Sequence, residues 1–357
     1  MILTYKIQHN SDFSDELRKA RAVAMYALKT KSRSSADVKH IGLKSAISNQ
    51  ILKKYSSNKK LKRVSSVKLT VPSQSIQVNH DTKIIKIPCL KLVFQYHVQF
   101  EKANQVEIDE QYIYLSVSVP KKECNLVTNY IGVDRNTTGH IAAVANPATG
   151  KVLKLGKMGL HVHNKYKHIR KDLQKKGKYK KVKQIKDRES RIVRDLNHKI
   201  SNKIVKTAIA ENSGIKLEDL TGIRRNNKHS KSFRYSLNSW SFYQLQMFIE
   251  YKAKLHGVDV VYIDPAYTSQ TCSKCGCIGN REGKSFECPT CGHVENADIN
   301  AAFNIAKSPY ISQSTKERDL VEGSTDTPKI ALVGTQLTIE PHQLLRWEYV
   351  RYSNSKF

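Results

Sequence analysis

The chain has 357 residues, 39% of them hydrophobic, which is enough for two or three domains with at least one buried core. Its 61 Lys and Arg outnumber 31 Asp and Glu and leave a net charge of +30, so a polyanionic partner is expected. The sequence offers no apolar run of about 18 residues and no secretory leader, so we expect a protein that neither crosses a membrane nor is exported.

Residues 1–127 predict strands that are interrupted by helices. A short strand is expected at 2–8, and two apolar stripes at helical spacing predict two helices within 11–65. From residue 66 onward the hydrophobic period changes to two, most clearly in the run YIYLSVSV. We therefore expect a small β-barrel formed by residues 1–10 and 66–127, with a helical insert at 11–65.

Residues 128–307 change to an α/β pattern. Three strands linked by turns, YIGVD, IAAVA and KVLKL, open this part, as they do in RNase H-like folds. Helices are predicted at 185–211 and 239–256, and they alternate with the strands IKLEDL and VDVVYI, which indicates an α/β sheet. Residues 308–357 are polar and weakly patterned, so we predict only a C-terminal tail of uncertain order.

A strongly basic stretch lies between His161 and Ile200. It holds 15 Lys and Arg against 4 acidic residues. A solvated helix face would explain a charged run, but charge this one-sided favours contact with phosphates, and Tyr166 and Tyr179 are candidates for stacking on bases. The candidate nucleic-acid contacts are Lys165, Lys167, Arg170, Lys171, Lys175, Lys176, Lys178, Lys180, Lys181, Arg224 and Arg225.

Five of the seven cysteines lie in one segment, which favours a metal site over a disulfide framework. Two C-x2-C pairs separated by 12 residues supply four thiolates, the full ligand set of a structural, tetrahedral Zn²⁺. The expected ligands are Cys272, Cys275, Cys288 and Cys291. Gly276 and Gly292 follow the two pairs and free the backbone to turn toward the metal. Cys277 and His293 are expected to lie outside the site, and iron bound by the same four sulfurs is the alternative.

Three carboxylates lie in apolar surroundings, where an ionised group is unstable unless it is paired or bound to metal. Asp134 ends the strand YIGVD, Glu218 lies in IKLEDL, and Asp298 begins the helical segment DINAAFNIA. Gathered at one edge of a sheet, they would bind two Mg²⁺ ions and support phosphodiester hydrolysis. The pattern alone leaves alternatives open: the acids cap helices or form ion pairs, or Asp219 is the ligand in place of Glu218.

Four motifs follow one another along the chain: GVD at 132–134, LEDL at 217–220, the four-cysteine segment, and DINAAFNI at 298–305. Their order and spacing resemble the three split RuvC motifs and the ribbon of TnpB proteins, the insertion-sequence relatives of type V CRISPR effectors. The linking segments RDLNHKIS and PAYTSQTCSKCG also resemble this family, and the likeness covers about residues 128–307. The pair Arg135 and Asn136 departs from the family pattern, in which small residues often follow the first aspartate.

The resemblance implies an α/β multidomain protein whose nuclease core is RNase H-like (RuvC). The core would comprise residues 128–267 and 293–307, with a four-cysteine zinc ribbon inserted at 268–292. The preceding β-barrel would be the family's wedge domain, which binds oligonucleotides, and its helical insert would be the recognition lobe.

The same resemblance implies an RNA-guided DNA endonuclease of a transposable element. Asp134, Glu218 and Asp298 occupy the family's catalytic positions and would hold two Mg²⁺, while the four cysteines would hold one structural Zn²⁺. The expected partners are a noncoding guide RNA and double-stranded DNA that pairs with the guide beside a short target-adjacent motif. The expected location is the prokaryotic cytoplasm, in association with the nucleoid.

Other interpretations remain. A nuclease-dead, RNA-guided repressor on the same scaffold would have lost one or more acids, and a structure-specific RuvC-like nuclease that needs no RNA would require less basic surface. A transposase performing strand transfer uses the same kind of core. A zinc-ribbon protein without catalysis would leave three buried acids unexplained. The first two are the main alternatives to guided cleavage.

Overall fold

The computed structural model describes residues 1–58, 60–120, 122–124, 127–136, 139–220 and 242–309, together with the backbone of 337–339. The chain divides into two compact units, Met1–Pro120 with Lys329–Phe357, and Lys121–Pro328. Within the described ranges, no helix has both the length and the apolar character needed to cross a bilayer.

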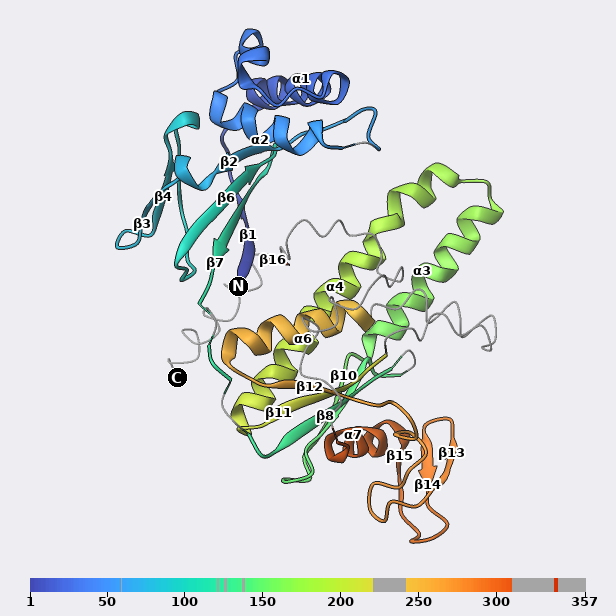
Figure 1. Cartoon of the computed structure of the whole chain (residues 1–357). Coiled ribbons are helices and arrows are strands. Elements are labelled where there is room, and N and C mark those ends of the chain that lie inside the picture. Colours follow the sequence, from blue (N-terminus) through green and yellow to red (C-terminus); the bar gives the residue numbers. More distant parts are fainter. Residues whose placement is uncertain are drawn as a thin grey trace, which may run out of the picture. The chain divides into compact units, whose positions relative to one another are not determined.

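The first unit combines two β-sheets with a helical insert (Figure 1). Its strands are β1 (Ile2–Gln8), β2 (Leu69–Pro72), β3 (Gln77–Asn79), β4 (Ile84–Ile87), β5 (Leu92–Gln95), β6 (Lys102–Ile108), β7 (Tyr112–Ser118) and β16 (Leu337–Ile339). Its helices are α1 (Ser14–Thr30) and α2 (Ser45–Ser56), with the 3-10 helices η1 (Ser35–Ile41), η2 (Ser73–Ser75) and η3 (Pro88–Leu90). One sheet has the order β16-β1-β7-β6-β2, and the other has the order β3-β4-β5.

The strand and the two helices predicted near the N-terminus are confirmed. β1 pairs along its whole length with β7, so the start of the chain is joined to a strand about a hundred residues later. The apolar stripes of α1 and α2 are buried, as the full burial of Val23, Ala24 and Ile47 shows. The helix η1 between them was not predicted, because a single short 3-10 segment produces no helical hydrophobic period. The closed barrel stays a prediction.

The second unit is α/β, as predicted. Its central strands are β8 (Tyr130–Arg135), β9 (Ala142–Ala145), β10 (Val152–Leu155), β11 (Gly214–Glu218) and β12 (Val260–Ile263). Its helices are α3 (Met158–Lys175), α4 (Tyr179–Ala210), α6 (Phe242–His256) and α7 (Ala297–Lys307). A small three-stranded sheet consists of β13 (Asn280–Glu282), β14 (Ser285–Glu287) and β15 (Val294–Asn296). The central sheet has the order β10-β9-β8-β11-β12, in which the first three strands are antiparallel and the last three are parallel.

Successive residues of the central strands face two different helical layers. Ile131 and Val133 of β8 are buried in a cluster with α4 and α6, which cover one face of the sheet (Figure 1). The other face is covered by α7, where Ala302 packs against Ala143 of β9. A strand sends alternate side chains to opposite faces, so the even-numbered residues of β8 and β11 face α7.

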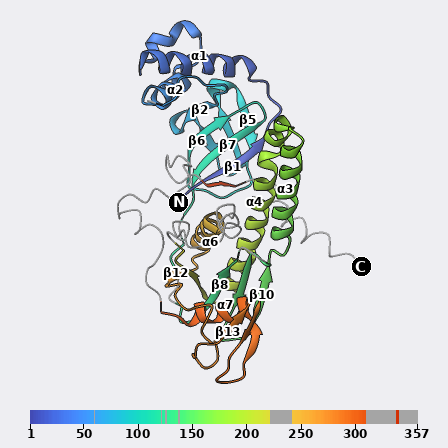
Figure 2. The same cartoon turned by 90° about the vertical axis from the view of Figure 1, so that its right-hand side faces the viewer.

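The basic stretch forms a helical hairpin. The predicted helix at 185–211 was too short, because α4 begins at Tyr179 and a second helix, α3, precedes it side by side (Figure 1 and Figure 2). Gly177, with φ +63°, makes the turn between the two helices. An apolar period is hard to see where basic residues are so frequent, yet lysine and arginine are good helix formers. Arg170 of α3 pairs with Glu189 of α4, which ties the two helices together.

Gly132 of β8 allows α7 to lie directly on the sheet. A Cβ atom at this position would stand 2.0 Å from the carbonyl oxygen of Ala302 and 2.5 Å from the backbone nitrogen of Ala306. Both neighbours are backbone atoms of one helical turn, so they cannot rotate away as a side chain would. Only glycine fits between this strand and this helix.

We predict that Gly132→Ala lowers the free energy of unfolding by about 3 kcal/mol, because α7 must move off the sheet to admit the methyl group. Thermal melting measures the loss. Gly150→Ala is the control: its φ is +68°, but no atom lies within 4 Å of the added Cβ, so only backbone strain of about 1 kcal/mol is expected. Equal losses in the two variants would contradict the close contact with α7.

Candidate active site and metal centre

Asp134 and Glu218 lie near the ends of two neighbouring parallel strands. The residues just before them form a register pair between β8 and β11, so the two acids stand side by side at the carboxyl edge of the sheet. Alternation along β11 points Glu218 toward α7, as it does Lys216, whose Nζ donates to the carbonyl oxygen of Ser308 at 2.7 Å just after α7 ends.

Asp298 lies in the first turn of α7. The contact of Gly132 with Ala302 fixes its level relative to the sheet. The four residues from Ala302 back to Asp298 rise about 6 Å along the helix. The two residues from Gly132 to Asp134 advance about 6–7 Å along the strand. These equal steps from one contact point bring Asp298 level with Asp134. In agreement, the charge of Asp298 raises the pKa of Asp134.

The three carboxylates are buried, and they repel one another. Burial first, and then the charges of Glu218 and Asp298, raise the pKa of Asp134 to about 7, although a hydrogen bond from Asn136 lowers it. Burial also raises the pKa of Glu218, while the hydroxyl of Thr268 lowers it. Like charges in a medium of low dielectric constant favour a bound cation.

Three polar neighbours that the sequence did not reveal hold the first two acids. The Nδ2 atom of Asn136 donates to Oδ2 of Asp134 at 2.8 Å, and the hydroxyl of Thr268 donates to Oε1 of Glu218 at 2.5 Å. The buried guanidinium of Arg135 donates from Nη2 to the carbonyl oxygen of Glu218 at 2.5 Å. Arg135 and Asn136 are the residues that depart from the family pattern, and both act at this site.

Asp298 is bound by two cations from the small three-stranded sheet. Lys284 Nζ contacts both carboxylate oxygens, at 2.8 and 2.7 Å, and Arg281 Nη2 lies 3.5 Å from Oδ1. The sequence analysis missed both residues. Their position in a short hairpin between the two cysteine pairs, about 15 residues before Asp298, gives no local sign of this contact.

The three carboxylates have the ligand chemistry that a hard divalent cation needs, but their oxygens are not yet spaced to bind one. Oxygen ligands, burial and a raised pKa suit Mg²⁺, and Asp298 already binds an ammonium group. Among the described residues, however, only the four cysteines form a group of three or more potential ligands that could hold a metal ion as they stand. Asp219 lies next to Glu218 and interacts with Arg135. The assignment of Glu218 over Asp219 therefore stays a proposal.

The four predicted cysteines come together in the ribbon. Cys272 Sγ lies 3.7 Å from Cys291 Sγ, and Cys275 Sγ lies 3.5 Å from Cys288 Sγ. A tetrahedral Zn²⁺ with bonds of about 2.3 Å places its sulfurs about 3.8 Å apart, so the cluster fits a zinc ribbon. The backbone N–H of Cys291 lowers the pKa of the Cys288 thiol to about 6, which favours the thiolate that metals bind.

The glycines after both cysteine pairs behave as predicted. Gly276 has φ +80° and Gly292 has φ +68°, and each backbone N–H donates to the carbonyl oxygen of the first cysteine of its pair. Cys277 and His293 are not members of the four-sulfur cluster. Cys277 instead accepts a backbone hydrogen bond from Cys272 through its carbonyl oxygen.

The basic candidates lie on the α3–α4 hairpin. Those that the structure describes are exposed, except Arg170, which is half-buried against Glu189. Lys176 pairs with Asp172 one turn earlier in α3. Arg224 and Arg225 lie outside the described residues. Contact between these side chains and phosphates stays a prediction.

Comparison with known proteins places the chain among relatives. Residues 242–305 match the family model described as "Cas12f1-like, TNB domain". The TnpB-like protein MJ0751 of Methanocaldococcus jannaschii is 39% identical over 189 residues, which cover 49% of this chain and 68% of that protein. The chain belongs to the TnpB-like family.

The similarity extends to a longer protein and to a solved structure. The CRISPR-associated endodeoxyribonuclease Cas12f1 of Sulfoacidibacillus thermotolerans is 46% identical over 131 residues, 36% of this chain and 30% of that protein. A structure described as a Cas12f1–sgRNA–target DNA complex has the same fold, with a TM-score of 0.57 at 18% identity, over 84% of this chain and 82% of that chain. The TnpB-like chain therefore spans less than half of the Cas12f1 protein from S. thermotolerans in sequence, while sharing a fold with the Cas12f1 structure over most of its length.

We predict one zinc ion per chain in protein purified without added metal, measured by elemental analysis. Cys288→Ser should lower this stoichiometry and the melting temperature, because a structural metal contributes directly to folding. Cys277→Ser is the matched control, a cysteine of the same segment that lies outside the cluster, and it should retain the zinc. Iron in place of zinc, or reduced protein without metal, would rule out the assignment.

We predict that Asp134→Asn stabilises the protein in the absence of Mg²⁺. The pKa of Asp134, about 7 in the folded state, exceeds the unfolded value of about 3.9, so wild-type stability falls as pH rises between these values. The variant lacks this loss. Its free energy of unfolding should exceed that of the wild type by on the order of 2 kcal/mol at pH 8, and by much less at pH 5.

Thermal melting at pH 5 and pH 8 tests this expectation. Asp219→Asn is the control, because it replaces the acid that directly follows β11. This variant should not show the increase in stability at pH 8. A destabilised Asp134→Asn protein at pH 8 would show that the carboxylate has a structural role that outweighs repulsion.

Proposed function

We propose that this TnpB-like protein is an RNA-guided DNA endonuclease of a transposable element. It would cleave double-stranded DNA that is complementary to its guide and flanked by a short target-adjacent motif, on the nucleoid of a prokaryotic host. The observation that carries the proposal is the convergence of three buried acids from β8, β11 and α7 in a chain of net charge +30. A fold does not maintain such repulsion for stability, so the site favours a role in metal-dependent chemistry.

The proposed domains follow the sequence expectation. The mixed sheet with α4, α6 and α7 would be the RNase H-like (RuvC) core, and the cysteine cluster with β13 and β14 would be its zinc ribbon. The sheets of the first unit would be the wedge domain, and α1 with α2 the recognition lobe. The shared fold with the Cas12f1 complex supports this arrangement without fixing the boundaries.

The chain's own residues would prepare the site for phosphodiester hydrolysis. Asp134, Glu218 and Asp298 would hold two Mg²⁺, which supply an activated water and stabilise the leaving 3′ oxygen. Asn136 and Thr268 orient the first two carboxylates through the hydrogen bonds given above, so the ligands are positioned before any substrate arrives. Lys284 contributes positive charge beside Asp298, where a phosphate would approach.

Sequence specificity must come from outside the carboxylate site, which meets only phosphate and metal. Base pairing with a guide RNA supplies it in RNA-guided nucleases, while the protein contacts the backbone and a short flanking motif. The exposed lysines of the α3–α4 hairpin suit such backbone contacts. Relatives named as CRISPR-associated endodeoxyribonucleases, and a Cas12f1 structure with guide RNA and target DNA, support a noncoding RNA and double-stranded DNA as partners.

The decisive experiment replaces the guide end of the copurified RNA and measures plasmid cleavage in Mg²⁺. We predict that cutting follows the new guide and disappears when the RNA is digested before assembly. Cleavage that ignores the guide, or survives complete RNase treatment, would favour an unguided structure-specific nuclease.

Variants separate guided cleavage from guided binding in the same assay. Asp134→Ala, Glu218→Ala and Asp298→Ala should each reduce cleavage by about 1,000-fold or more while RNA binding is retained, because the three acids act as one unit. Asp219→Ala is the control and should be mild. A wild-type protein that binds guide-matched DNA without cutting it would support the repressor.

A further inference from the structure

A cavity of about 350 Å³ lies at the base of the ribbon, next to the carboxylate edge of the sheet. One wall is the segment from Ala266 to Gly276, which includes the first cysteine pair, and the other is formed by the last turns of α7. Residues from both walls include Tyr267, Thr268, Lys274, Asn304 and Lys307. The volume is at the small end of the range for ligand pockets, which suits one nucleotide.

Thr268 connects this cavity to the proposed active site. The residue lines the cavity, and its hydroxyl donates to the Oε1 atom of Glu218 at 2.5 Å. A molecule in the cavity is therefore one side chain away from a carboxylate that is proposed to bind metal.

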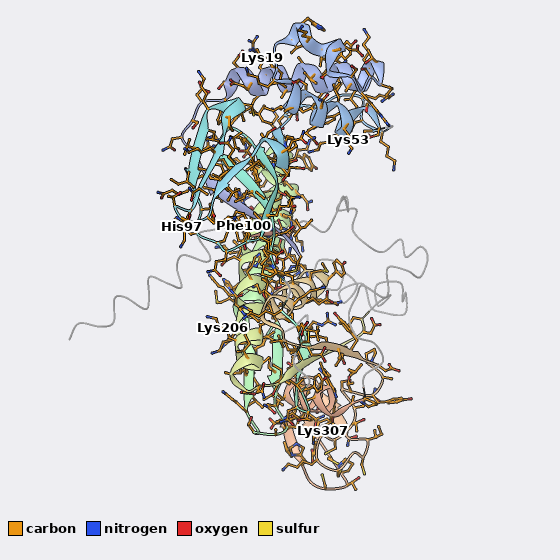
Figure 3. The ribbon with its side chains drawn as sticks, turned by 60° about the vertical axis from the view of Figure 1, so that its left-hand side comes forward. Lys19, Lys53, His97, Phe100, Lys206 and Lys307 are labelled. Carbon is orange, nitrogen blue, oxygen red and sulfur yellow. The ribbon has the colours of Figure 1, made fainter. Side chains whose placement is uncertain are left out.

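The helix that carries Asp298 also holds the opposite wall in place. Asn304 Nδ2 donates to the carbonyl oxygens of Thr268 and Thr271, at 2.9 and 2.6 Å. Lys307, labelled in Figure 3 at the last turn of α7, donates to the carbonyl oxygen of Ser273 at 2.6 Å. The cavity and the carboxylates are thus built on the same rigid elements.

Tyr267 is held in a conformation that tyrosine rarely adopts. Its φ is +62°, which costs a non-glycine residue about 1–2 kcal/mol, and its side chain is 66% exposed. Its carbonyl oxygen accepts hydrogen bonds from the backbone of Gln270 and from the backbone and hydroxyl of Thr271. The backbone is therefore fixed while the ring stays accessible at the wall of the cavity. Strain of this kind concentrates at binding sites.

We propose that this cavity is a nucleotide subsite of the nuclease: the ring of Tyr267 stacks on the base of one unpaired nucleotide of the strand being cut, and the exposed Lys274 contacts its phosphate. The inference rests on the proposed nuclease function and adds to it two residues that position the substrate. A base inside a duplex has both faces covered by its neighbours, so a tyrosine can stack on it only after the strand has been opened. The contact of Tyr267 with the base then fixes the position of the cut relative to that base.

The first test compares cleavage of DNA substrates in which one nucleotide at a time near the cut is abasic. For the RNA-loaded wild type, one abasic position should lower kcat/KM about tenfold, the range that one base stacked on an aromatic ring contributes. Tyr267→Ala should show the same loss on intact DNA and no further loss at that position. Tyr267→Phe should behave as wild type.

Two further variants serve as controls for folding and for the loss of an exposed tyrosine. Tyr267→Gly accepts φ +62° without strain and replaces Tyr267→Ala if that protein folds poorly. Tyr243→Ala removes another exposed tyrosine of the same unit, 42% exposed on α6 and not part of the cavity wall, and should retain the wild-type pattern. If Tyr267→Ala cleaves intact DNA as fast as wild type, or is equally sensitive to the abasic position, the subsite is wrong.

A second measurement does not depend on cleavage. Single-stranded DNA carrying 2-aminopurine is titrated with the full-length Asp134→Asn protein, since this fluorophore is quenched when it stacks. Quenching that is lost in the additional Tyr267→Ala variant supports the subsite even if guided cutting fails. Equal quenching with and without Tyr267 overturns it, even if guided cutting succeeds.

Discussion

The contact between Gly132 and α7 is the constraint on which the proposed active site depends. Two backbone segments approach so closely that no Cβ atom fits between them. Strands and helices are both stiff. This single contact therefore determines which later residues of β8 lie level with which earlier residues of α7. Asp134 and Asp298 are reached by equal steps from it. The spacing of two carboxylates is therefore set by backbone packing, which is more rigid than any side-chain contact.

The site is electrostatically unfavourable in isolation, and its surroundings compensate only in part. Burial and mutual repulsion keep the pKa of Asp134 near neutrality. Thr268 and Asn136 donate one hydrogen bond each, which orients the acids but does not neutralise them. Lys284 and Arg281 bring positive charge to Asp298, and Arg135 and Arg281 lower the pKa of Glu218, yet burial still holds the pKa of Asp134 and of Glu218 above the ordinary value. The remaining negative potential at the other two acids is what a divalent cation would satisfy, in a chain whose overall charge draws nucleic acid toward the same protein.

The sequence predicted local patterns well and long-range contacts poorly. Strands such as β8 and the four-sulfur cluster were predicted because the hydrophobic period or the cysteine spacing is itself the structural cause. The hairpin of α3 and α4 was only half predicted, since its apolar stripe is thin among lysines. The roles of Gly132, Thr268 and Lys284 were not predicted at all. Each depends on a partner 14 to 170 residues away along the chain, which no local pattern records.

The four-cysteine ribbon has a second consequence beyond its own stability. It is inserted between the segment that carries Thr268 and the helix that begins with Asp298, and its hairpin supplies Lys284 and Arg281 to that aspartate. If the four thiolates did not order the ribbon, these two cations would lose their fixed positions, and Asp298 would face Asp134 without compensation. Asn304 ties the other end of the insertion to α7 through two carbonyl oxygens. A metal bound by these four sulfurs, with no open coordination position, would therefore act on the charge balance of the proposed carboxylate site through the rigidity of the segment between them.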